Sequence, residues 1–102
     1  MIKVLSMMKR KEGMSLDEFR HWLTEEHSKL SQAIPGLDKF IVNIAKTDSP
    51  DNPFDSVNEL YFADEAAMQA AFGSDAGKAS GEDALAHISG RSRLITIEYR
   101  LK

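Results

Sequence analysis

The chain has 102 residues, of which 42% are hydrophobic and 28% are charged, and it contains no cysteine. This length suits one domain over residues 1–102, and the composition excludes a disordered chain. The net charge of −3 argues against nucleic-acid binding, and the lack of cysteine excludes disulfides and thiolate chemistry. No apolar run is long enough for a membrane span and no secretory signal is visible, so we expect a cytoplasmic protein without membrane contact.

Residues 2–9 are predicted to form the first strand, because apolar side chains occupy both of its alternating faces. A strand of that kind is usually covered on both sides. The basic residues 9–11 follow and lead to Gly13, which is more typical of a solvated turn than of a phosphate-binding site.

A long helix is predicted next. Ser15 and Glu18 have the spacing of a capping box at its N-terminus, and the helix must end before Pro35-Gly36. Its apolar residues recur at helical spacing and form one stripe that faces the core. The stripe consists of Leu16, Phe19, Leu23, Leu30 and Ile34.

The middle of the chain predicts two strands joined by a loop. Residues 37–47 and 57–63 are rich in β-branched and aromatic residues and alternate as strands do. Residues 48–56 between them contain two prolines and three aspartates, which favours an irregular loop.

The last part of the chain predicts helices and a closing strand. Asp64 is suited to cap a helix that ends at Gly73. Further helical stretches are expected over 74–79 and 82–88, separated by a serine and a glycine. Residues 91–101 alternate as a strand.

The order strand, helix, strand, strand, helix, strand predicts an α+β fold of the ferredoxin-like, split βαβ type. This plan has an antiparallel four-stranded sheet with helices on one face. Because the strands are apolar on both faces, the helix-free face needs a cover. We expect a homodimer in which two sheets pack face to face. The alternative is a monomer in which the loop over residues 48–56 covers that face.

His27 is the best candidate for chemistry. It lies between Leu23 and Leu30 on the inward side of the predicted helix, where an imidazole facing a cavity serves as a general acid or base near neutral pH. A half-buried histidine held by a backbone carbonyl is the alternative. His21 is expected on the solvent side of the helix. The sequence does not decide whether His87 lies near the same cavity or on the surface.

Other motifs for chemistry are missing from the sequence. There is no H-E-x-x-H pair, no phosphate loop and no nucleophile elbow, so metal binding and nucleophilic serine catalysis are not expected. From the residues alone, no functional role is assigned to Trp22, Phe40 or Tyr61, which are expected to pack in the core or to lie on the surface.

Four segments, taken in order, resemble the EthD family over nearly the whole chain. The most specific part is the E-x-H motif at residues 25–27 of the first helix, followed after residues 28–34 by P-G-L. The segments are S-L-D-E-F-R-H-W-L-T-E-E-H at 15–27, I-P-G-L-D-K-F at 34–40, E-L-Y-F-A-D-E-A-A-M at 59–68 and G-S-D-A-G-K-A at 73–79.

The resemblance implies a dimeric α+β barrel whose subunits pair sheet to sheet. It also implies a small cyclic or polyketide-like ligand and lactone isomerisation, cyclisation or aromatisation without metal or flavin. The resemblance implies that His27 lines a pocket between helices and sheet and is the catalytic residue. The residues that we expect to bind the substrate are Phe40, Tyr61, Trp22 and His87. A lactone-isomerising relative has a tyrosine after P-G-L-x-K, where this chain has Phe40, which has no hydroxyl to donate.

Three functions therefore stay open from the sequence. The first is a cofactor-free isomerase, cyclase or lyase that uses His27 for proton transfer. The second is a monooxygenase of the related cofactor-free type, or a haem-binding relative. The third is a non-catalytic protein that binds a metabolite of a catabolic pathway.

Overall fold

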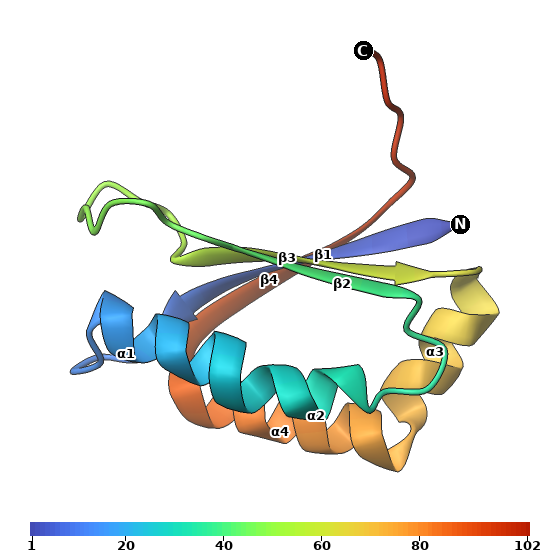
Figure 1. Ribbon diagram of the computed structural model, residues 1–102, viewed down its shortest axis with the longest axis horizontal. Coiled ribbons are helices and arrows are strands. Elements are labelled where there is room, and N and C mark those ends of the chain that lie inside the picture. The colour runs from blue at the N-terminus through green and yellow to red at the C-terminus, as the bar shows by residue number, and fades with distance from the viewer.

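A computed structural model describes residues 1–102 and has a four-stranded antiparallel sheet with helices on one face (Figure 1). The strands lie in the order β2-β3-β1-β4. They are β1 (Ile2–Arg10), β2 (Lys39–Ile44), β3 (Ser56–Phe62) and β4 (Ile88–Thr96). The helices are α1 (Leu16–His21), the π-helical turn η1 (Trp22–His27), α2 (Ser28–Gln32), α3 (Glu65–Gly73) and α4 (Asp75–His87). This arrangement confirms the predicted α+β fold.

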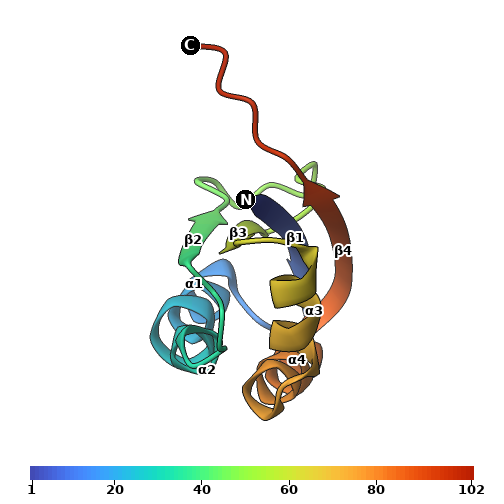
Figure 2. The same ribbon diagram turned by 90° about the vertical axis from the view of Figure 1, so that its right-hand side faces the viewer.

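The molecule has two layers when it is viewed along the helices. Figure 2 shows α1 and α2 on one side and α3 and α4 on the other, all beneath the sheet, while the opposite face carries no helix. No helix has the length and apolar character needed to cross a membrane.

The last strand differs from its prediction over residues 91–101. It begins earlier, at Ile88, and ends at Thr96, which pairs with Lys3 near the start of β1. Residues 97–102 are not part of the strand and lead away from the sheet (Figure 1), because from residue 98 onward the chain lies beyond the first residue of β1.

The first helix begins at the predicted capping box. The backbone N–H of Glu18 donates to Ser15 Oγ at 3.0 Å, and the Ser15 N–H donates to Glu18 Oε1 at 2.9 Å. The π-helical turn η1 then shifts the register of the helix, because its hydrogen bonds span five residues rather than the four of an α-helix. The prediction that Leu30 faces the core is therefore wrong: Leu30 is exposed, and Ser31 is buried instead.

The predicted break between residues 79 and 82 is also wrong, because α4 is continuous from Asp75 to His87. Ser74 caps it by accepting a hydrogen bond from the Gly77 N–H at 3.0 Å. Ser80 is buried and its hydroxyl lies 3.1 Å from that of Ser31 on α2. The small residues of α4 thus allow a close approach of the two helices.

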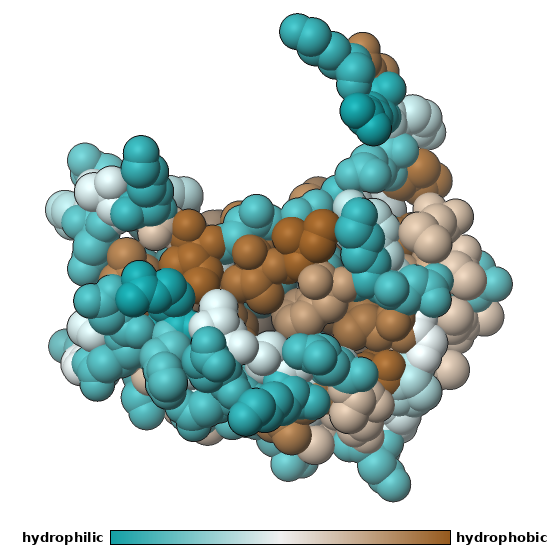
Figure 3. Space-filling model, in the orientation of Figure 1, coloured by the Kyte–Doolittle hydropathy of each residue, from teal (hydrophilic) through white to brown (hydrophobic).

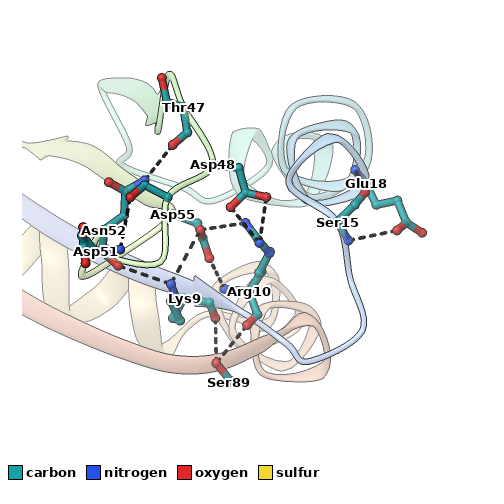
Figure 4. Close-up of polar contacts among 11 residues, drawn as sticks. Lys9, Arg10, Ser15, Glu18, Thr47, Asp48, Asp51, Asn52, Asp55 and Ser89 are labelled. Atoms are coloured by element: carbon teal, nitrogen blue, oxygen red, sulfur yellow. Dashed lines mark hydrogen bonds and ion pairs between the residues drawn. The ribbon is translucent and has the colours of Figure 1, made fainter.

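The basic residues at the end of β1 anchor the loop between β2 and β3 (Figure 4). Arg10, the last residue of β1, donates to Asp55 through its backbone N–H at 2.8 Å and through Nη1 at 3.0 Å. Its Nη2 also donates to Asp48 at 3.0 Å. Arg10 is therefore an ion-paired strand residue rather than part of a solvated turn. The loop lies at one end of the sheet and leaves the helix-free face uncovered (Figure 1).

The core consists of two apolar clusters that a polar row separates. Ser6 lies between Val4 and Met8 on β1, and its cross-strand partners are Asn58 on β3 and Arg93 on β4. One cluster contains Val4, Ile34, Leu60, Phe62, Met68 and Ala71. The other contains Met8, Phe19, Trp22, Leu23 and Ala84. A hydrophobic sheet face is thus interrupted by polar side chains at its centre.

The helix-free face combines apolar side chains with an ion-pair network. Lys3 donates to Glu59 at 2.9 Å and to Glu98 at 2.7 Å, and Tyr61 donates to Glu98 at 3.2 Å. The hydrogen bond to Glu98, and to a smaller extent the one to Glu59, raises the pKa of Lys3. The apolar residues that alternate onto this face are Leu5, Met7, Ile41, Val57 and Leu94.

Candidate functional site

His27 lies at the last position of η1 and is 3% exposed. Its Nδ1 atom is 2.9 Å from Oδ2 of Asp83 on α4. Because a carboxylate only accepts hydrogen bonds, Nδ1 carries the proton, and a neutral ring then leaves the Nε2 lone pair free. The ring lines a cavity between helices and sheet, so His27 combines a fixed tautomer with access to an interior space.

Asp83 holds Trp22 and His27 together. The same Oδ2 atom accepts a hydrogen bond from Trp22 Nε1 at 3.1 Å. The Trp22 ring packs against His27, with 4.8 Å between the centroids, and stacks on His87 at 4.5 Å. His87 donates its Nδ1 proton to the backbone carbonyl of Asp83 at 2.7 Å. These contacts restrict the orientation of the His27 ring.

Burial and charge act on the His27 imidazole in opposite directions. Desolvation lowers its pKa below the ordinary 6.5, and it outweighs the hydrogen bond and charge of Asp83, which raise it. His27 is therefore neutral at pH 7 and able to accept a proton. Once protonated, it would be stabilised by the adjacent carboxylate.

The cavity beside His27 has a volume of about 30 Å³, which is room for about one water molecule. It lies between the two apolar clusters, where the polar row of the sheet faces α2 and α4. Figure 3 views the molecule from the side of edge strand β2, where apolar side chains form a band between sheet and helices. Phe40 and Phe72, both half-buried, contribute aromatic walls.

Several polar atoms at the cavity have no hydrogen-bond partner. Ser6 Oγ and Asn58 Oδ1 are buried and unpaired, and so is Nη1 of Arg91. Arg93 also lines the cavity, where its guanidinium lies 4.8 Å above the Phe72 ring. Because buried polar atoms are nearly always paired, these atoms are available to a water molecule or another polar group in the cavity.

The structure brings together only some of the residues predicted from the sequence. Phe40 and His27 line the same cavity, and Trp22 packs behind the His27 ring. His87 lies on the outer side of Trp22, in a surface groove that it shares with His21. Tyr61 lies on the helix-free face of the sheet, away from the cavity.

Asp83 and the polar residues of the cavity were not predicted from the sequence. The spacing of Asp83 and His87, four residues apart within the predicted helix over 82–88, indicated that they share a face, but nothing in the sequence placed that face against His27. Alternation places Ser6 on the same face of its strand as Val4 and Met8, but only the packing of the helices shows that this face is the inner one and that Asn58 and Arg91 share it. The chain has no group of three or more His, Asp or Glu side chains placed to hold a metal ion.

The sequence over residues 11–91 matches the family model of the EthD domain. The crystal structure of an EthD-family protein from Bacillus halodurans is 28% identical, with a TM-score of 0.83 over 97% of this chain and 99% of that chain. A search of the curated proteins gives no match.

More distant structures share the fold. A dimeric ferredoxin-like protein of unknown function from Thermobifida fusca is 17% identical, with a TM-score of 0.75 over 93% of this chain and 88% of that chain. An antibiotic biosynthesis monooxygenase is 16% identical, with a TM-score of 0.70 over 98% of this chain and all of the other. At these identities the likeness concerns the fold alone.

Proposed function

The chain belongs to the EthD family, and from this premise we propose that it binds a small organic molecule in the cavity and transfers a proton on it through His27. One observation carries the proposal. A buried imidazole is fixed by a carboxylate at 2.9 Å through Nδ1 and lines an interior cavity. This pair of groups is the usual arrangement of a general base and its orienting residue.

The chemistry follows from the protonation states. Neutral His27 accepts a proton from a carbon acid at Nε2, and Asp83 stabilises the resulting imidazolium through Nδ1. Return of the same proton to a different atom of the substrate is an isomerisation, and the overall charge is conserved. In a cyclisation or an elimination, His27 likewise takes the proton from carbon, and the imidazolium then gives it to the new alkoxide oxygen or to the departing group. The step needs only these side chains.

The cavity limits the substrate to a small molecule. Its volume of about 30 Å³ has to increase for any guest larger than water, and the half-buried rings of Phe40 and Phe72 are the side chains that can move aside. Phe40 offers an apolar contact and no proton. The reaction therefore relies on His27 alone for acid and base steps.

We also propose that two copies pair through their helix-free sheet faces. Apolar side chains on this face, including Leu94, which is 57% exposed, support the pairing. A face of this kind usually forms an interface. The Thermobifida fusca neighbour is described as dimeric.

The test is exchange of substrate protons with solvent. Small lactones, ketones and phenols would be incubated with the protein in D₂O, and incorporation of deuterium would be followed by proton NMR. We expect the wild type to catalyse exchange in at least one compound and His27→Gln to lose it. His21→Gln is the matched control, because His21 is an exposed histidine on the same helix.

Two other functions give different results in the same samples. Exchange that persists in folded His27→Gln contradicts the role of His27. Saturable binding without exchange or product indicates a metabolite-binding protein. Oxygen uptake with electron-rich phenols indicates an oxygenase, the function named for one structural neighbour.

A further inference from the structure

The polar side of the cavity is positively charged and has no acidic lining residue. Of the residues that line it, Arg91 and Arg93 are the only ones with a full charge at neutral pH, and none is Asp or Glu. The whole chain, in contrast, has a net charge of −3. The positive charge inside is therefore a local feature rather than a result of composition.

Neither arginine has an ion-pair partner within the protein. Arg91 is half-buried, and its Nη1 atom is fully buried without a hydrogen bond. Arg93 packs on the ring of Phe72 but donates to no carboxylate. Desolvation first, and then the neighbouring Arg91, lower the pKa of Arg93. The buried Nη1 atom of Arg91 is unfavourable unless a hydrogen-bond acceptor compensates it, whereas the Arg93 side chain is exposed at the mouth of the cavity.

The strand register places these arginines beside two other unpaired groups. Arg93 is opposite Ser6 and Arg91 is opposite Met8, and Ser6 is in turn opposite Asn58. Ser6 is 4% exposed and Asn58 is 2% exposed, and their Oγ and Oδ1 atoms have no partner. The hydroxyl of Ser6 is a further donor for an anionic oxygen, whereas Asn58 Oδ1 accepts from a protonated group.

We propose that this cavity is a binding site for a small organic carboxylate, whose oxygens accept hydrogen bonds from Arg91, Arg93 and Ser6. Guanidinium groups match carboxylates in charge and in planar geometry, and such charge-assisted bonds are the stronger class. The inference rests on the proposed function in one respect, since the carboxylate belongs to the molecule on which His27 acts. It narrows the substrates to acids whose reacting carbon lies near the His27 imidazole.

Matched pairs of acids and amides test this inference without any reaction. Acetate, butyrate and benzoate would be titrated against acetamide, butyramide and benzamide, and amide chemical shifts of the full-length protein would be recorded. We expect at least one carboxylate to bind saturably and to change the backbone amide chemical shifts of Ser6 and Asn58. Its affinity should be at least tenfold higher than that of the matching carboxamide. A tenfold ratio corresponds to about one charge-assisted hydrogen bond.

Variants assign the effect to the two arginines. Arg91→Gln and Arg93→Gln should each weaken binding at least tenfold, and Arg91→Lys should restore part of it. Arg100→Gln is the control and should bind as the wild type does, because Arg100 lies in the exposed C-terminal tail. Arg91→Lys also serves if Arg91→Gln fails to fold.

Three results would overturn the inference: equal affinity for acids and amides, unchanged binding in both glutamine variants, or no binding of any carboxylate. Failure of the proposed function is separate, because binding is measured without catalysis. If the protein binds carboxylates but catalyses no proton exchange, the anion site is supported and the acid/base function of His27 is contradicted.

Discussion

Oδ2 of Asp83 lies 2.9 Å from Nδ1 of His27, although 56 residues separate the two in the chain. The contact joins η1 to α4 and occurs next to the cavity. It explains how a buried histidine is kept in one tautomer with its other nitrogen free.

Asp83→Asn should keep the fold but lower proton-exchange activity by roughly 10²-fold, because a neutral amide does not stabilise the imidazolium. The variant should also lower the pKa of His27 further, since Asp83 raises it. Both quantities are measurable by NMR, from deuterium incorporation and from titration of the imidazole protons. Asp75→Asn, on the exposed first turn of the same helix, is the control. Unchanged exchange together with an unchanged His27 pKa would contradict the role of Asp83.

Stability should fall below about pH 6.5 because of His27. Its pKa is lower in the folded state than the ordinary 6.5, so the unfolded chain binds more protons as the pH falls through this range. The contribution of neutral His27 to the free energy of unfolding is complete above pH 6.5 and is lost as the pH falls through the pKa of His27 in the folded state. Urea unfolding at pH 7.5 and 5.5 measures the effect. His27→Gln should lose less free energy of unfolding than the wild type; equal losses would show that other groups cause the change.

Gly77→Ala should destabilise the protein by about 1–3 kcal/mol, as overpacking does. A Cβ atom at Gly77 would lie 2.2 Å from the carbonyl oxygen of Ala71 and 2.9 Å from Cα of Phe72. Gly81→Ala is the control within the same helix, because nothing lies within 4 Å of its Cβ position. Alanine there should stabilise the helix by up to about 1 kcal/mol. Thermal unfolding of both variants would reveal the opposite signs, and equal effects would contradict the close packing of α3 and α4.

Leu94→Lys should dissociate the proposed dimer, because it places a charge on the helix-free sheet face. Leu85→Lys, on the outside of α4, is the control, since the two leucines have similar exposure, 57% and 64%. Sedimentation velocity should give a dimer for the wild type and for Leu85→Lys and a monomer for Leu94→Lys. A monomeric wild type, or a dimer in all three, would rule out this interface.

Local patterns in the sequence were sufficient for most of the fold. The capping box at Ser15 and the alternation in the strands depend on neighbours within a few residues, so they were predicted correctly. The exposure of Leu30 and the continuity of α4 were not. A π-helical turn and the packing of a small residue such as Ser80 depend on what the helices contact.

The sequence by itself therefore determined the class of fold, the EthD resemblance and the choice of His27, because periodicity, caps and motif order are local properties. Only the tertiary structure decided what surrounds that histidine. Asp83 contacts His27 from a helix that is distant in the sequence but adjacent in space. The pairing register brings Ser6, Asn58 and Arg93 into one row across the sheet. A shift of one residue in the pairing register of a strand would turn the side chains of that strand to the opposite face, and the register is fixed by long-range packing rather than by any single segment.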